Sequence, residues 1–324
     1  MTLTRRAVVA SLPGMAASAA RAQSNDNRQD RPVTFIVPFA PGGGTDTLAR
    51  LLAQKLELRL GAPFTVEVRP GGGTVIATNL VAKSPPDGNT LMMAVSSLAI
   101  DVTLYKKLPY DPVKDVALVG LIASVPFVLV VSASLPVGSV DDLIKLARQK
   151  PLSYGSGGIG SFHHLAGALF AKMADVTMTH VPYRGSTPAL NELVAGYIQV
   201  LFSDLGPALP LIKAGKVRAL AVTTSQRLPS LPDIPPLDES GLPGFDAAAW
   251  QGVIARADTP RTILEGLNSE LNAIVAMEDV RARLADLGMN PIGQGSLEEL
   301  HEFLEADIAR WARLVEEAGL AKSE

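Results

Sequence analysis

The chain has 324 residues, a formal net charge of −3 and no cysteine. The lack of cysteine excludes disulfides, thiolate metal sites, a cysteine nucleophile and a lipid-anchored cysteine. An acidic chain with 5% aromatic residues and no clusters of lysine or arginine is also poorly suited to binding nucleic acid. The composition therefore predicts a protein that relies on its apolar core for stability and does not bind nucleic acid.

Residues 1–22 have the three parts of an export signal. Arg5 and Arg6 form a basic start, residues 7–20 are largely apolar, and a small-x-small cleavage pattern ends at Ala22. Both the general secretory route and the twin-arginine route remain open. Cleavage would remove three arginines and no acids, which leaves 302 residues with a net charge of −6. Because no later apolar run is long enough to span a membrane, we expect a free periplasmic protein that is not inserted in the membrane.

Apolar strand-like runs alternate with helical patterns along the mature chain. In the first part we predict strands at 33–39, 64–68 and 90–95, and helices at 45–60 and through 80–83. A long β-rich stretch at 116–132 separates this part from a second alternating series. That series predicts helices at 139–150, 161–174 and 188–195, and strands near 152–154, 176–181, 198–202 and 219–223. Such alternation is typical of βαβ units.

The last third of the chain decides the predicted architecture. Residues 228–244 are rich in proline and glycine and are predicted to be a loop. After Trp250 we expect helices, one opened by Thr259 as N-cap with Pro260, and one by a capping box at Ser296 and Glu299. These helices have no sheet of their own, so we expect them to pack on the first sheet.

This arrangement predicts an α/β fold with two domains, each a mostly parallel sheet flanked by helices. The chain would leave the first domain near residue 125, build the second, and return near residue 247. The predicted limits are 31–125 with 247–324 for the first domain and 126–246 for the second. Two crossings make a double hinge, and small-molecule sites are common in the cleft between hinged domains.

Two glycine-rich turns, each between a predicted strand and a helix, are the main candidates for the site. The first contains Gly42, Gly43 and Gly44, followed by Thr45 and Asp46. The second runs from Gly155 through Gly157 and Gly158 to Ser161. Glycines before a helix let backbone N–H groups approach a ligand, and the helix N-terminus carries partial positive charge. Two such turns, one in each half, predict an anion held from both sides, although each could also be a plain connection.

Other chemistries remain weaker alternatives for the second turn. Gly155, Gly157 and Gly160 match a dinucleotide-binding pattern, but the acid at Asp175 precedes the next predicted strand instead of ending it. The turn lacks the glycine that a hydrolase nucleophile elbow requires. His163 and His164 are adjacent, so they point about 100° apart on a helix and cannot chelate one metal as an i, i+4 pair would.

Polar residues also follow strands of the second domain. Arg184 follows the predicted strand at 176–181, and Ser203 and Asp204 follow the one at 198–202. The carboxyl ends of parallel strands are where ligands of α/β proteins bind, so these residues could reach the cleft, although a surface role fits equally. Trp250 could stack on a ligand, but a hinge or core role fits better.

Seven motifs in order resemble the Bug family, the substrate-binding proteins of tripartite tricarboxylate transporters. They are Val37-Pro-Phe-Ala-Pro-Gly-Gly-Gly-Thr-Asp46, Arg69-Pro-Gly-Gly-Gly73, Pro86-Asp-Gly-Asn-Thr-Leu91, Leu104-Tyr-Lys-Lys-Leu-Pro-Tyr-Asp111, Gly155-Ser-Gly-Gly-Ile-Gly-Ser161 with His164-Leu-Ala166, His180-Val-Pro-Tyr-Arg-Gly185 and Ile212-Lys-Ala-Gly-Lys-Val-Arg-Ala-Leu-Ala-Val222. The resemblance as a whole runs from about residue 31 to residue 320. The resemblance implies a type II-like periplasmic binding protein of the Venus-flytrap kind, which closes on a small carboxylate and serves a transporter. Thr74 and Ser203 depart from the family pattern, so the resemblance does not fix the ligand.

The resemblance and the turns together give the predicted ligand-binding residues. They are Phe39, Gly42, Gly43, Gly44, Thr45, Asp46, Gly157, Gly158, Ser161, His164, Tyr183, Arg184, Thr187, Ser203 and Asp204. The expected ligand is a dicarboxylate, tricarboxylate, aromatic acid or acidic amino acid, and we expect no cofactor, no metal and no catalytic residue. A sensor that engages a membrane kinase is the main alternative. A secreted hydrolase is a weaker one, for which Ser161 with His164 is the local pair to check.

Overall fold

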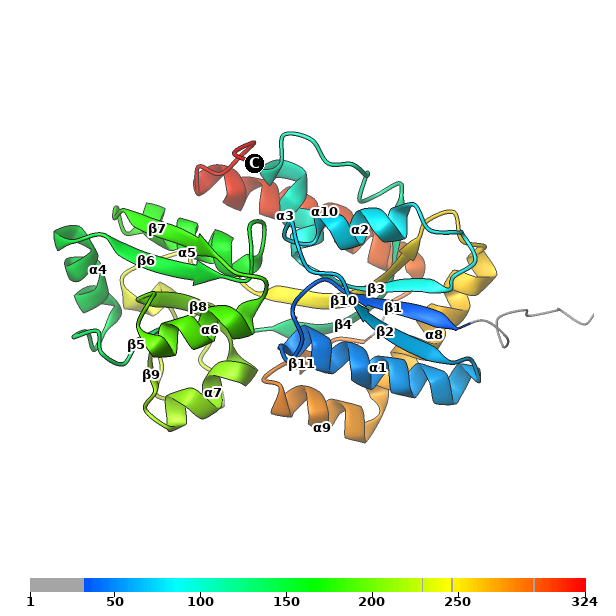
Figure 1. Ribbon diagram of the computed structural model, residues 1–324, viewed down its shortest axis with the longest axis horizontal. Coiled ribbons are helices and arrows are strands. Elements are labelled where there is room, and N and C mark those ends of the chain that lie inside the picture. The colour runs from blue at the N-terminus through cyan, green and yellow to red at the C-terminus, as the bar shows by residue number, and fades with distance from the viewer. Residues whose placement is uncertain (1–31, 229, 246, 294) are drawn as a thin grey trace, which may run out of the picture.

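The computed structural model describes residues 32–228, 230–245, 247–293 and 295–324. The predicted export signal at 1–22 lies outside these residues. The described chain forms two lobes side by side, each built around a sheet with helices packed on it (Figure 1). None of the helices in the described ranges has the length and apolar character needed to cross a lipid bilayer.

The first lobe contains a six-stranded sheet in the order β11-β4-β10-β3-β1-β2. Its strands are β1 (Val33–Val37), β2 (Phe64–Val68), β3 (Thr90–Val95), β4 (Val116–Val125), β10 (Ala249–Arg256) and β11 (Asn290–Pro291). Its helices are α1 (Gly44–Leu60), α2 (Val75–Ala82), α3 (Ser97–Leu104), α8 (Arg261–Ala276), α9 (Glu278–Asp286) and α10 (Leu297–Glu317). The C-terminal helices pack on this first sheet, as expected, with α8 and α10 both in contact with β4.

The second lobe contains a five-stranded sheet in the order β7-β6-β8-β5-β9. Its strands are β5 (Phe127–Ser132), β6 (Leu152–Ser156), β7 (Met178–Pro182), β8 (Val200–Asp204) and β9 (Val217–Val222). Its helices are α4 (Val140–Gln149), α5 (Phe162–Met173), α6 (Ser186–Ala195) and α7 (Leu205–Lys213), and a 3₁₀ turn, η1 (Asp238–Ser240), lies in the proline-rich return segment.

The prediction of mostly parallel sheets is wrong, because each sheet is mixed. β1 pairs in parallel with β2 and β3, and β6 pairs in parallel with β7 and β8. However, β10 is antiparallel to β3 and β4, and β5 is antiparallel to β8 and β9. The reversed strands are those that carry the chain between the lobes. A strand that enters or leaves a sheet directly, without a crossover helix, is free to run against its neighbours.

The expectation that helices begin directly after Trp250 is also wrong, because the chain first forms strand β10 through Arg256. Residues 249–255 of β10 are all buried in the middle of the first sheet. The chain passes between the lobes at Pro126, which separates β4 from β5, and returns in the segment before β10. The two sheets thus agree with a double crossing, while the exact domain limits of 31–125 with 247–324 and of 126–246 stay a prediction.

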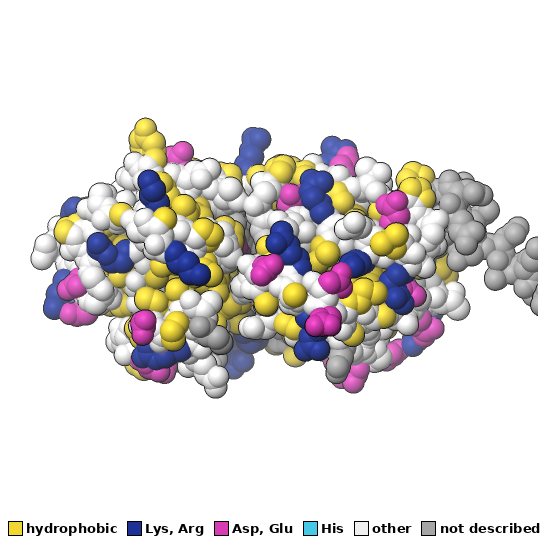
Figure 2. Space-filling model, turned by 90° about the horizontal axis from the view of Figure 1, so that it is seen from below, with side chains coloured by type: hydrophobic (Ala, Val, Ile, Leu, Met, Phe, Trp, Pro, Cys, Tyr) yellow, Lys and Arg dark blue, Asp and Glu magenta, His cyan; other side chains and the backbone are white. Residues whose placement is uncertain are grey.

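Helix starts follow local chemistry closely. Ser296 and Glu299 form the predicted capping box of α10, with both reciprocal hydrogen bonds present. At α8 the prediction fails, because Pro260 is the N-cap and the buried hydroxyl of Thr259 has no partner among the described residues. Figure 2 shows basic and acidic side chains interspersed across both lobes on the face seen from below, so this face has no field of a single sign.

Candidate functional site

A pocket lies between the two lobes, and both lobes supply its walls. From the first lobe it is lined by Phe39, Ala40, Gly43, Gly44, Thr45, Asp46, Val95, Ser96, Ser97, Val125, Ala249, Trp250 and Gln251. From the second lobe it is lined by Phe127, Ser161, Phe162, His163, Ser186 and Asp204. The lining therefore mixes four aromatic rings with hydroxyl groups, an amide and backbone from glycine turns.

Five helices begin at this pocket. The lining includes residues at the N-termini of α1, α3, α5, α6 and α7, namely Gly43 and Gly44, Ser96 and Ser97, Ser161 and Phe162, Ser186, and Asp204. Each of these helices follows a strand directly along the chain. Their first turns therefore gather where the strands of both sheets end, as in other α/β proteins.

The helices that begin here direct the positive ends of their dipoles at the pocket. Each helix N-terminus is equivalent to roughly half a positive charge, and its first N–H groups have no partner within the helix. The N-caps Gly43, Ser96 and Gly185 make no side-chain capping bond, so no cap side chain competes with a ligand for the first amides of these helices. Among the described residues that line the pocket there is no lysine or arginine. Anion binding here would depend on backbone dipoles and hydroxyl groups.

Asp46 would repel an anion if its charge were free, but its carboxylate is occupied. Oδ2 accepts the backbone N–H of Gly42 at 3.0 Å, and Arg50 pairs with Oδ1 at 3.0 Å. The side chain thus folds the first glycine turn against its own helix. Asp46 has a structural role in shaping this turn even though it lies at the pocket wall.

A second carboxylate, Asp204, faces the pocket from the other lobe. Its Oδ2 lies 3.4 Å from Nε2 of His163, and both side chains are about nine-tenths buried. Burial raises the pKa of the Asp204 carboxyl, but the nearby His163 and the polar side chain of Ser186 outweigh burial and hold this pKa below its usual range. The His163 ring also packs edge-on against Phe127 at 5.1 Å, which fixes its direction.

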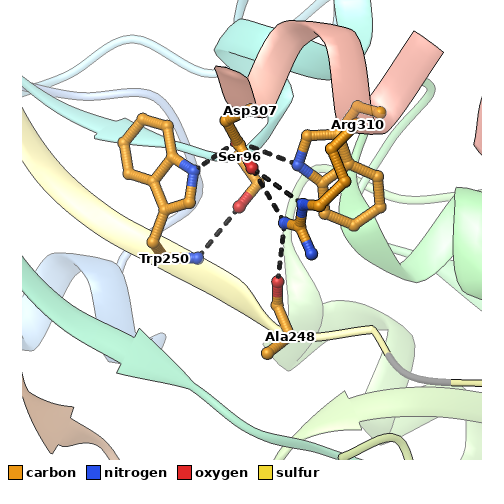
Figure 3. A network of polar contacts seen from close by, with 6 residues as sticks. Ser96, Ala248, Trp250, Asp307 and Arg310 are labelled. Atoms are coloured by element: carbon orange, nitrogen blue, oxygen red, sulfur yellow. Dashed lines mark hydrogen bonds and ion pairs between the residues drawn. The ribbon is translucent and has the colours of Figure 1, made fainter. Parts of the chain in front are cut away.

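A buried network holds the first-lobe wall in place (Figure 3). The backbone N–H of Trp250 donates to Oγ of Ser96 at 2.9 Å, and its indole Nε1 donates to Asp307 at 2.7 Å. Asp307 also accepts from Nε1 of Trp311 at 3.0 Å and pairs with Arg310 at 2.8 Å. Helix α10 therefore positions Trp250 and, through it, the start of α3.

The structure brings part of the predicted site together. Seven of the fifteen predicted residues line the pocket, and these are Phe39, Gly43, Gly44, Thr45, Asp46, Ser161 and Asp204. The other eight, Gly42, Gly157, Gly158, His164, Tyr183, Arg184, Thr187 and Ser203, lie outside that lining. Gly42 and Gly158 shape the two turns through positive φ angles of 86° and 127°. Ligand contact by any of the fifteen stays a prediction.

Several of these eight residues lie close behind the pocket walls. The hydroxyl of Thr187 is 3.7 Å from where a Cβ on Gly43 would be, and Arg184 contributes its carbonyl, which accepts the N–H of Ala40 at 2.9 Å. Ser203 is fully buried and donates to the carbonyl of Asp204 at 3.1 Å. Tyr183 is half-buried beside the second turn. The side chain of Arg184 itself is exposed.

The two adjacent histidines have different surroundings. His163 lines the pocket, whereas the His164 ring stacks on His180 at 4.0 Å and accepts the Gly160 N–H at 3.4 Å. Ser161 bonds to the backbone N–H of His164 and donates to the carbonyl of Gly158, so its hydroxyl does not contact the His164 ring. The pair that a hydrolase would need is not formed there.

The dinucleotide alternative also lacks its acid. Asp175 lies in the turn between α5 and β7, with a positive φ of 51°, and it is exposed. It therefore precedes β7 and does not reach the carboxyl end of a strand, where a ribose would bind.

Five polar residues of the lining, Ser96, Ser97, His163, Ser186 and Gln251, were not among the predicted site residues. Ser96 and Ser97 follow β3 directly, so the rule that selected Asp204 at the end of β8 would have found them too. Ser186 begins α6, two residues beyond Arg184. Gln251, whose amide donates to Thr45 at 3.0 Å, was missed because β10 was not predicted.

The lobes contact each other around the pocket. Besides the bond from Ala40 to Arg184, a Cβ on Gly73 would lie 2.3 Å from the carbonyl oxygen of Ile159. Similarly, a Cβ on Gly160 of the second lobe would lie 2.2 Å from the carboxylate of Asp101 in the first lobe. Turns from opposite lobes thus touch through glycine positions.

The fold and the pocket are those of a two-lobed binding protein with a cleft between its lobes. The match to a family of proteins is more specific. Residues 48–320 match the tripartite tricarboxylate transporter family receptor, and the chain belongs to that family. This confirms the resemblance seen in the sequence motifs.

Solved structures agree with this family. The R. palustris protein Rpa4515, solved with adipate, is 40% identical to this chain with a TM-score of 0.85, and the match covers 90% of this chain and 98% of that one. The periplasmic binding protein BugD is 32% identical with a TM-score of 0.85, covering 90% and 99%. MatC from Rhodopseudomonas palustris, with bound malate, is 34% identical with a TM-score of 0.83, and the match covers 88% of this chain and 99% of that one. The chain is therefore a solute-binding protein of the Bug type.

Proposed function

We propose that this protein captures a small organic carboxylate in the cleft between its lobes. The observation that carries the proposal is the meeting of five helix N-termini at one pocket, with no lysine or arginine among the described residues that line it. Backbone N–H groups in such positions hold carboxylates well. The adipate and malate in the related structures support the same class of ligand.

Capture would proceed by closure of the two lobes as bodies 31–125 with 247–324 and 126–246. A ligand that contacts both lobes at once favours the state in which both walls are in place. The first glycine turn and Gln251 belong to one wall, and Ser161, Ser186 and Asp204 to the other. The paired strands that cross between the lobes would serve as the hinge.

Delivery to a membrane transporter of the tripartite tricarboxylate type would follow closure. The family of the chain supports this step, and export to the periplasm with cleavage near Ala22 would place the protein beside such a transporter. The protein would act by binding and release, without a catalytic residue, metal or cofactor.

A thermal-shift screen of the mature chain tests the binding claim. The panel contains aliphatic and aromatic monocarboxylates, dicarboxylates, tricarboxylates and acidic amino acids, with chloride and sulfate as anion controls. A ligand at 100 times its Kd adds about 2.7 kcal/mol of stability, so a binding carboxylate should raise Tm by several degrees. A flat response to the whole panel would overturn the proposal. Mass spectrometry of ligand carried through purification gives an independent identification.

A further inference from the structure

Two carboxylates lie in the lining of the pocket, and they differ in how they are paired. Five helix N-termini supply about two and a half positive charges, while Asp46 and Asp204 place two carboxylates in the same lining. Asp46 is occupied by Gly42 and Arg50, as described above. No lysine or arginine in the described lining adds to the positive side. Since Arg50 pairs with Asp46, Asp204 beside His163 is the carboxylate that a ligand anion would meet in the pocket.

Asp204 differs from Asp46 because its charge faces the pocket. Its nearby partners are His163, at 3.4 Å, and the hydroxyl of Ser186, and all three side chains line the pocket. The negative charge is held there because these partners favour the ionised form. A second ligand carboxylate next to it would meet a fixed like charge in a largely buried site, where repulsion is weakly screened.

Acceptors that need donors lie on both walls of the pocket, Asp204 on the second-lobe wall and Gln251 on the first-lobe wall. A carboxylate can only accept hydrogen bonds, and Oε1 of the buried Gln251 has no donor among the described residues. Leaving such acceptors unpaired in a closed cleft costs binding free energy. A ligand group that donates, such as a hydroxyl or an ammonium, would satisfy them.

The remaining walls are apolar and rigid. Phe127 stacks on Phe162 at 4.0 Å, and Trp250 is fixed by Asp307. These rings suit a hydrocarbon body between the two polar groups of a ligand.

We propose that Asp204, oriented by His163, determines specificity by excluding a second carboxylate and selecting a monocarboxylate that also carries a hydrogen-bond donor. This inference rests on the proposed binding of carboxylates. It narrows the ligand class to hydroxy acids or amino acids with a single free carboxylate.

Four probes that share a six-carbon chain test the inference on the unmodified mature protein. Hexanoate, 6-hydroxyhexanoate, 6-aminohexanoate and adipate all have a carboxylate at one end and differ only at the other end, which in adipate is a second carboxylate. Titration calorimetry should show a donor-bearing probe binding most tightly, and adipate binding roughly tenfold or more weakly than that probe. The hydroxy and amino probes separate the two possible donors.

Asp204→Asn provides the matching variant, because it removes the charge and keeps the size. The ratio of adipate affinity to 6-hydroxyhexanoate affinity should rise about tenfold in this variant. Asp141→Asn is the control, since it makes the same charge change on the exposed side chain that pairs with Lys145 on α4. That control should leave the ratio unchanged.

The possible failures are distinguishable. If adipate binds the unmodified protein as tightly as the best donor-bearing probe, the inference is wrong while carboxylate binding stands. The same holds if carboxylates of the wider screen bind but none of these four does. If no carboxylate binds at all, both the inference and the proposed function are overturned.

Discussion

At the scale of single residues, Asp307 is a buried carboxylate that satisfies several hydrogen-bond donors at once. It is 5% exposed, accepts two indole N–H groups, and pairs with Arg310, whose guanidinium lies 4.5 Å from the Trp311 ring. A buried carboxylate is tolerated when its partners satisfy it, and loss of the carboxylate leaves those partners unpaired. The rotamer of Trp250 at the pocket wall depends on this acid (Figure 3).

Replacing this acid should therefore cost much more than replacing an exposed one. For Asp307→Ala we expect a loss of about 3 kcal/mol or more in the free energy of unfolding, because two indole donors and a guanidinium lose their acceptor. Urea unfolding followed by tryptophan fluorescence measures this loss. Asp258→Ala, which removes an exposed partner of Arg256, should change stability little. Equal effects of the two variants would refute this assignment.

The stacked histidines make stability depend on pH. Burial lowers the pKa of His164 to about 4, and burial together with the charge of His164 lowers that of His180 to about 3. In the unfolded chain both titrate near 6.5, so the stability that neutral rings provide is complete above that pH. This stability is lost as pH falls from 6.5 towards 4, because over that range the histidines bind protons in the unfolded state and not in the folded state.

Between pH 7 and pH 5 we expect the His164 ring to account for about 2 kcal/mol of lost stability. In His164→Phe, which keeps an aromatic ring in the stack, the fall in unfolding free energy over this range should be smaller by about that amount. His301→Phe is the control, because His301 is exposed on α10 and its change should leave the pH dependence as it is. Denaturant titrations at the two pH values decide the matter, and identical pH dependence in wild type and His164→Phe would contradict the account.

At the scale of elements, the sequence predicted those that obey periodicity and local capping. Helix α1 and strands β2 and β3 occur close to their predicted limits because their apolar spacing and flanking turns are unambiguous. β10 was missed because a continuous apolar run has no period to identify it, and its burial comes from β3 and β4, far away in the sequence. Strand β10 therefore depends on tertiary pairing, which cannot be recognised from the local sequence.

The candidate site likewise contains some features that the sequence predicts and others that depend on the fold. Turns with glycine before a helix, such as Gly43 to Asp46, can be recognised from the sequence because few other residues adopt their backbone conformation. The direction of a side chain is different, since His163 faces the pocket and His164 faces His180 only because of how α5 rotates on its sheet. The pairing of His163 with Asp204 likewise depends on two segments that meet only in the fold.

Helix α5 offers a test of a helix start at the pocket. Ser161 accepts the N–H of His164 as N-cap and lines the pocket, whereas Ser139 caps α4 by the same chemistry away from it. Both Ser161→Ala and Ser139→Ala should cost about 1 kcal/mol of stability. Only Ser161→Ala should also weaken carboxylate binding, measured by calorimetry. Equal affinities in the two variants would remove Ser161 from the site.

At the scale of the whole molecule, the two lobes meet through glycine turns that leave no space for a side chain. Gly73 of the first lobe faces the carbonyl of Ile159, and Gly160 of the second faces the buried carboxylate of Asp101. Helix α10 also spans the junction, where Trp311 meets Phe162 edge-on with ring centroids 5.9 Å apart. Close approach of the lobes thus depends on the missing Cβ atoms, and a methyl group there should hold them apart.

Gly73→Ala tests whether this approach belongs to ligand binding. The added Cβ would lie 2.3 Å from the Ile159 oxygen, a clash that separation of the lobes relieves. Gly61→Ala is the matched control, because Gly61 has nearly the same positive φ, 68° against 65°, with open space around it. Both variants should lose about 1 kcal/mol of stability from backbone strain. Only Gly73→Ala should bind carboxylate roughly tenfold or more weakly, because the competent state becomes rare. Calorimetry showing equal affinity in the two variants would mean that the lobes need not meet at Gly73 when ligand is bound.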